Sequence, residues 1–220
     1  MGGFRNEANN IAFENGLFHL IIVHLFQCSH DMAEKCKATG NQLHNHEDRI
    51  TDRLVANHLN LNNLGLRFIP QSSETFIPEE DVYKGRCDIK VVSDDWFRNL
   101  DDYYLIECKR IDGGSPLNRQ YVSEGVSRFI ENPAKYASYH KRNIMFGYVV
   151  QAIDIAENAA KIDQLQGELL VGVLPGKFLL VDNTSAEFYH YSCQYQYEIN
   201  DSIELAHLFY DFSAVTRNSV

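Results

Sequence analysis

The sequence predicts a single α/β domain, because helical and strand-like patterns alternate along 220 residues of ordinary globular composition. Apolar residues make up 45% of the chain and charged residues 23%, which favours one substantial core and excludes a disordered chain. The segment from Asn143 to Gln151 is almost continuously apolar, as is typical of a strand covered on both faces. We therefore expect residues 1–220 to form one domain in which helices flank a central sheet.

The first part of the chain is expected to be helical. Residues 11–38 carry apolar side chains at helical spacing, and a second helix is predicted from about Asn45 to Leu61. Four strand-like segments follow, at 66–69, 74–77, 86–92 and 103–108. An acidic connection over residues 93–102, with a short helical turn, joins the last two strands.

The second half is predicted to alternate between helix and strand. Ser115 and Pro116 suit the N-cap and first position of a helix that runs to about Glu131. Gly125 costs roughly 1 kcal/mol inside a helix, and close approach to a strand or ligand would explain it. The remaining predicted elements are a strand over 143–151, a helix over 154–165, strands over 169–174, 177–181 and 187–199, and a closing helix over 202–210.

Tyrosines alternate with polar residues along the predicted strand 187–199. The alternating residues are Tyr189, Tyr191, Cys193, Tyr195, Tyr197 and Ile199. This pattern fits either packing against the core or stacking on nucleic-acid bases.

Polar residues interrupt two of the apolar strands. Residues i and i+2 of a strand point to the same face, so Glu107 and Lys109 would project side by side while Cys108 turns away. Asp88 begins the strand before them, and the two strands can bring all three polar side chains into one cluster. Exposed ion pairs contribute only about 0–1 kcal/mol, which does not explain why charges interrupt both strands at facing places.

An Asp followed by Glu-x-Lys on an apolar strand resembles the PD-(D/E)xK nuclease superfamily, although Cys87 stands where the name has Pro. The wider context, with Tyr-x-x-x-Gly-x-x-Arg-Phe from Tyr121 to Phe129, is similar to uncharacterised bacterial proteins of restriction and phage-defence type. The resemblance implies a restriction-endonuclease-like core over about 45–151. That core is a central mixed β-sheet flanked by helices, here with an N-terminal helix and a β-rich C-terminal edge.

The resemblance also implies a site that hydrolyses phosphodiester bonds with Mg²⁺, or with Mn²⁺ as a substitute. Asp88, Glu107 and the main-chain carbonyl of Cys108 would hold the metal, and Lys109 would orient the attacking water and neutralise phosphate charge. Whether Lys109 also removes a proton stays open.

Two further carboxylates have alternative interpretations. Glu47 would hold a second metal or a metal-bound water, or it would only occupy the first turn of a helix, where the helix dipole favours a carboxylate. Glu74 could reach the site from an adjacent strand.

The charge distribution selects candidate nucleic-acid contacts. A net charge of −10 argues against a protein that coats nucleic acid nonspecifically, but residues 109–142 contain seven basic and three acidic residues. Arg110, Arg119, Tyr121 and Arg128 are the candidates in that stretch. A solvated helix face, with Arg128 paired to Glu124, is the alternative.

Cysteine usage bears on location and on zinc. Five cysteines without framework spacing indicate reduced thiols and a cytoplasmic protein. The apolar stretch Leu17 to Phe26 is too short for a membrane span. A zinc site among Cys28, His30, Cys36, His44 and His46 fits no standard finger spacing, and core thiols with surface histidines are the alternative.

The expected function is Mg²⁺-dependent endonucleolytic cleavage of DNA, with RNA as an alternative substrate, in a bacterial restriction or phage-defence system. A chain of this size is expected to act as a homodimer or with a partner subunit. The alternative is a catalytically silent nucleic-acid-binding or assembly module with the same fold.

Overall fold

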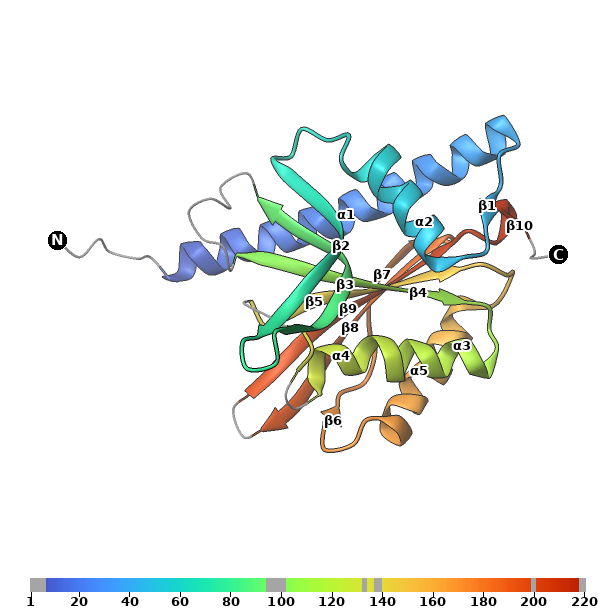
Figure 1. Ribbon diagram of the computed structural model, residues 1–220. Coiled ribbons are helices and arrows are strands. Elements are labelled where there is room, and N and C mark those ends of the chain that lie inside the picture. Colours follow the sequence, from blue (N-terminus) through green and yellow to red (C-terminus); the bar gives the residue numbers. More distant parts are fainter. Residues whose placement is uncertain (1–6, 94–101, 132–133, 137–139, 199–200, 218–220) are drawn as a thin grey trace.

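The structure is a computed structural model that describes residues 7–93, 102–131, 134–136, 140–198 and 201–217. It is a mixed α/β fold in which a sheet of eight strands lies between two layers of helices (Figure 1). The predicted acidic connection over residues 93–102 falls almost entirely outside the described residues.

Two helices cover one face of the sheet. Helix α1 (Glu7–Thr39) runs the length of the molecule beside α2 (Glu47–Leu54), which continues as a π-helical turn, η1 (Val55–Leu59). The predicted helices over 11–38 and 45–61 are thus confirmed, with boundaries that differ by a few residues. Buried side chains of these helices pack on the sheet residues that face them, including Phe68, Ile106, Cys108 and Phe146.

The opposite face is covered by a three-part helix and by α5 (Ile155–Leu169). The three-part helix consists of α3 (Ser115–Gln120), a π-helical segment η3 (Tyr121–Val126) and α4 (Ser127–Ile130), which follow one another without a gap. Its N-cap is Gly114 rather than the predicted Ser115. Within the described residues, no helix is long and apolar enough to cross a membrane.

The sheet is mixed, with strand order β2-β3-β4-β5-β9-β8-β6, and β7 also pairs with β8. The neighbouring pairs β4–β5 and β5–β9 are parallel, and the other pairs are antiparallel. The strands are β2 (Leu66–Ile77), β3 (Val82–Ser93), β4 (Tyr103–Ile111), β5 (Arg142–Val149), β6 (Leu174–Pro175), β7 (Leu179–Ser185), β8 (Phe188–Glu198) and β9 (Asp201–Asp211). A separate parallel pair joins β1 (Leu43–His44) to β10 (Thr216–Arg217), after the short 3-10 turn η4 (Ser213–Val215).

The largest difference between the predicted and the observed elements lies at residues 201–211. The predicted closing helix over 202–210 is the strand β9, which lies inside the sheet between β5 and β8. Its residues Ile203, Leu205, Ala206, Leu208, Phe209 and Tyr210 are all buried. A strand that is buried on both faces is apolar at most positions, so its pattern is hard to tell from that of a short buried helix.

Two smaller predictions also change. The predicted strand over 169–174 is wrong, because Leu169 ends α5 and only Leu174 begins a short strand. The predicted segments 66–69 and 74–77 are parts of one strand, β2, in which Gln71 has a positive φ of 51°. The alternating tyrosine strand is confirmed as β8, and Tyr191 and Tyr195 pack into the core.

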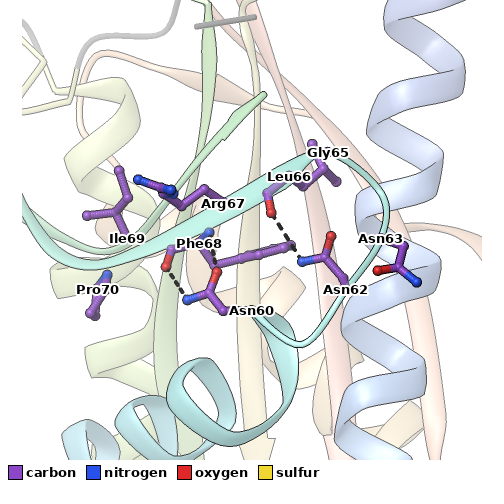
Figure 2. Close-up of a pocket in the computed structure, with 9 residues that line it drawn as sticks. All are labelled: Asn60, Asn62, Asn63, Gly65, Leu66, Arg67, Phe68, Ile69 and Pro70. Atoms are coloured by element: carbon purple, nitrogen blue, oxygen red, sulfur yellow. Dashed lines mark hydrogen bonds between the residues drawn. The ribbon is translucent and has the colours of Figure 1, made fainter. Parts of the chain in front are cut away.

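The free edge of β2 is covered by side-chain amides from the loop that precedes it. The Asn60 amide donates to the Phe68 carbonyl and accepts from the Phe68 N–H, both at 2.9 Å, as a neighbouring strand would. Asn62 donates to the carbonyls of Leu59 and Leu66. Asn60, Asn62 and the start of β2 line an open pocket of about 850 Å³, and none of the predicted site residues lies in that lining (Figure 2).

Candidate active site

Strands β3 and β4 separate at the place where the predicted polar cluster begins. Their last paired residues are Ile89 and Ile106, and Asp88 lies one residue beyond. The Asp88 carboxylate replaces the strand partner that Cys108 lacks there, since Asp88 Oδ2 accepts a hydrogen bond from the main-chain N–H of Cys108 at 2.6 Å. The sequence therefore brings Asp88 against the Glu-x-Lys segment, as predicted.

The Lys109 ammonium lies at the centre of the cluster. It donates to Glu107 Oε1 at 2.8 Å, to Glu47 Oε1 at 3.0 Å and to the Cys108 carbonyl at 2.9 Å. An ammonium has three donors, so all of them are used. Glu107 is completely buried and Lys109 is 7% exposed, so these two opposite charges stabilise each other in a largely dry environment.

Glu107 has two more partners, Arg128 and Tyr136, and Tyr136 was not predicted from the sequence. Arg128 Nη1 lies 3.0 Å from Glu107 Oε1, and the Tyr136 hydroxyl lies 2.7 Å from Oε2. Arg128 thus pairs with Glu107 and not with Glu124 as in the alternative interpretation. Tyr136 comes from a loop after α4, and its local sequence has no periodic or motif signal that could have marked it.

Glu47 joins the site from the first turn of α2. Besides its contact with Lys109, its Oε2 accepts the main-chain N–H of Arg110 at 3.1 Å, which ties the start of α2 to the end of β4. Glu47 therefore lies in the first turn of a helix and also reaches the cluster, and its role as a metal ligand stays a prediction. Glu74 is separate from the cluster and binds Lys90 and the Tyr103 hydroxyl.

The three-part helix packs closely against the site at Gly125. A Cβ on Gly125 would lie 2.5 Å from Met145 Cε and 3.4 Å from Lys109 Cγ. The predicted close approach of Gly125 to a strand is therefore confirmed. The π-helical segment around it is a type of distortion that is often found at functional sites.

Burial and mutual repulsion set the electrostatics of the cluster. Burial, with the neighbouring Glu107 charge, raises the pKa of Asp88 from 3.8 to about 7. Burial alone would lower the pKa of Lys109, but the Glu107, Glu47 and Asp88 carboxylates outweigh it and raise that pKa. Lys109 therefore stays an ammonium. The three carboxylates Glu47, Asp88 and Glu107 lie near only two cations, Lys109 and Arg128.

The cysteines and histidines provide no second centre in the described part of the chain. All five cysteines are free and buried, and burial raises the pKa of the Cys108 and Cys87 thiols, so neither is a thiolate nucleophile. His30, His44 and His46 are exposed, which agrees with core thiols and surface histidines rather than zinc. No three His, Cys, Asp or Glu side chains among the described residues are placed to hold one metal ion together.

Four residues were predicted to contact nucleic acid, and for Tyr121 the prediction is wrong. Its side chain is fully buried, and its hydroxyl bonds to Nδ1 of the buried His207 at 2.9 Å, so it presents no surface to nucleic acid. Arg119 is exposed on α3. Arg110 is partly buried and donates to the main-chain and side-chain oxygens of Asn45.

No family model, curated protein or solved structure matches this chain. The geometry and chemistry of the cluster therefore provide the grounds for assigning a function.

Proposed function

We propose that this chain is a Mg²⁺-dependent nuclease that hydrolyses phosphodiester bonds of DNA. The observation that carries the proposal is the cluster around Lys109. Its ammonium is held by Glu47, Glu107 and the Cys108 carbonyl, and Asp88 is hydrogen-bonded to the same segment of β4. These are the groups that the PD-(D/E)xK resemblance selects.

The oxygen donors of the cluster suit a hard divalent cation. Mg²⁺ is usually bound by one or two carboxylates and keeps several waters, so Asp88, Glu107 and the Cys108 carbonyl are a sufficient set, with Glu47 beside them. The Lys109 ammonium already makes hydrogen bonds to three of these four oxygen groups, which supports their affinity for a cation. When bound, the metal supplies Lewis-acid stabilisation of phosphate charge and an acidified water.

Lys109 acts as a charge in this proposal and not as a base. Its raised pKa keeps the ammonium protonated at neutral pH, so its charge can neutralise a phosphate oxygen. Once it gives up one of its three present acceptors, it can also donate a hydrogen bond to the attacking water. The proton of the attacking water therefore goes to solvent and not to Lys109.

The sheet supports a restriction-endonuclease-like core as part of the proposal. β3 and β4 are antiparallel, β4 and β5 are parallel, and the three-part helix connects β4 to β5 across one face. This arrangement places Asp88, Glu107 and Lys109 on two neighbouring central strands. A bacterial restriction or phage-defence role, and action as a homodimer or with a partner subunit, belong to the same proposal.

Cleavage of supercoiled plasmid and of single- and double-stranded oligonucleotides tests the proposal. We expect nicking or linearisation with Mg²⁺ or Mn²⁺, and none with EDTA. Glu107→Gln and Lys109→Ala should abolish cleavage, while Lys161→Ala, which removes an exposed cation of α5 paired with Glu157, should retain it. Wild-type activity in folded Glu107→Gln or Lys109→Ala protein would refute the assignment.

One observation favours the alternative of a catalytically silent module. Both carboxylate oxygens of Glu107 are already satisfied by Lys109, Arg128 and Tyr136, as in a purely structural ion-pair network. Salt-dependent DNA binding without metal-dependent cleavage would support this alternative.

A further inference from the structure

Arg128 and Tyr136 form a compact unit on the buried Glu107 carboxylate. Arg128 Nη1 donates to the Tyr136 hydroxyl at 2.6 Å in addition to its contact with Glu107. The main-chain N–H groups of Lys135 and Tyr136 both donate to the Arg128 carbonyl at 3.1 Å, so backbone and side-chain contacts hold the pair together.

The hairpin of β2 and β3 supplies the surface against which this unit packs. A Cβ on Gly85 would lie 2.8 Å from Tyr136 Cε1, so only glycine lets the tyrosine ring lie so close to β3. The Arg86 carbonyl is 2.8 Å from the Tyr136 hydroxyl and 3.3 Å from Arg128 Nη1.

The Tyr136 hydroxyl has two acceptors for its single proton. Both Glu107 Oε2, at 2.7 Å, and the Arg86 carbonyl, at 2.8 Å, are within hydrogen-bonding distance. Rotation of the O–H bond exchanges one acceptor for the other without moving a heavy atom. The hydroxyl can therefore be satisfied whether or not Glu107 is available to it.

Two cations share Glu107, and they differ in how easily they can leave. The Lys109 side chain is 8% exposed and has two other acceptors, Glu47 and the Cys108 carbonyl. The Arg128 side chain is 29% exposed, and among the described residues it contacts no carboxylate besides Glu107. Water can therefore solvate a displaced Arg128 at much lower cost than a displaced Lys109.

We propose that Arg128 is exchanged between two anions: it is held on Glu107 in the metal-free protein and is released to the substrate phosphate when a divalent cation takes Glu107. This inference depends on the proposed function, because it assigns the order in which that site is filled. The planar guanidinium suits a phosphate, since its paired N–H groups match two phosphate oxygens. Tyr136 is the positioning residue that holds Arg128 beside the site during the exchange.

Metal binding to the free protein gives the first test, with Mn²⁺ titrated calorimetrically in the absence of nucleic acid. Arg128→Ala removes a competitor for Glu107, so it should bind Mn²⁺ more tightly than wild type, on the order of tenfold for the loss of one ion-pair contact. Lys161→Ala is the charge-loss control and should bind Mn²⁺ as wild type does. An unchanged or weaker Mn²⁺ affinity in Arg128→Ala would overturn the exchange.

Binding of a labelled duplex, measured by fluorescence anisotropy with EDTA or Ca²⁺, gives the second test. Wild-type affinity should rise by about tenfold with Ca²⁺, and Arg128→Ala should lose this rise. Glu107→Gln should bind as tightly in EDTA as wild type does in Ca²⁺, because Arg128 is free without a metal. A full Ca²⁺-dependent rise in Arg128→Ala would refute the proposal.

The outcomes separate this inference from the proposed function. An inactive wild type in which Arg128→Ala still tightens Mn²⁺ binding would refute the nuclease and leave the exchange standing. An active wild type whose Mn²⁺ affinity does not depend on Arg128 would refute the exchange alone. Failure of wild type to bind Mn²⁺ would overturn both.

Discussion

Asp88 is a carboxylate whose charge opposes folding, and Asp88→Asn should therefore stabilise the metal-free protein at alkaline pH. Its pKa is about 7 in the folded protein, because of burial and the nearby Glu107, against an ordinary value of 3.8. Asparagine removes the charge and still offers an oxygen to the Cys108 N–H that Asp88 now accepts.

The size of the effect follows from the two pKa values. Each pKa unit corresponds to about 1.4 kcal/mol, so the ionised form of Asp88 costs about 4 kcal/mol of folding free energy above pH 7. The folded protein holds a proton on Asp88 that the unfolded chain releases, so wild-type stability falls as the pH rises from about 4 to about 7. Asp88→Asn should gain about 2–4 kcal/mol at pH 8 and about 1–2 kcal/mol at pH 5.

Urea unfolding with EDTA at pH 5 and pH 8, followed by circular dichroism, measures both quantities. Asp48→Asn is the matched control, because Asp48 is exposed on α2 and its substitution should change stability by about 0.5 kcal/mol or less. A destabilised Asp88→Asn at pH 8, or a gain that is equal at both pH values, would refute the electrostatic reasoning.

Two further predictions concern the sheet. Gly147→Ala should lower the stability by about 1–3 kcal/mol, because its Cβ would lie 2.5 Å from Cδ1 of the buried Phe209 ring. The control Gly167→Ala, whose Cβ would have nothing within 4 Å, should raise the stability by up to about 1 kcal/mol. Thermal unfolding compares the two variants, and equal effects would contradict the packing of β9 on β5. Asn60→Ala should cost about 1–3 kcal/mol in urea unfolding, because the Phe68 N–H and carbonyl lose their partners, and a neutral result would show that water replaces the Asn60 amide.

The helical and strand patterns predicted most of the elements that build the site. The Glu107 and Lys109 alternation placed both side chains on one face of β4, because strand geometry fixes that relation locally. Asp88 was predicted beside them because a short interval separates two strand-like segments. Glu47 was selected only through the family resemblance, and the structure places it within 3.0 Å of Lys109.

Residues outside these local patterns could not be found in the sequence. Tyr136 reaches Glu107 only because its loop folds back onto the Arg128 carbonyl, and no spacing rule relates residues 107, 128 and 136. Tyr121 was wrongly selected as a nucleic-acid contact, because helical spacing gives its direction around the helix but not whether the sheet covers that direction.

The sequence by itself determined the alternation of helices and strands and the pairing of a carboxylate with an ammonium on β4. These features depend on backbone periodicity, which acts over a few residues. Only the tertiary structure decided that β9 is an interior strand and that Arg128 and Tyr136 join Glu107. Those outcomes depend on which surfaces of distant segments meet. A buried helix and a buried strand are alike in sequence, so only the packing on β5 shows that residues 201–211 form a strand. The contact between Arg128 and Glu107 joins residues whose spacing in the sequence follows no rule.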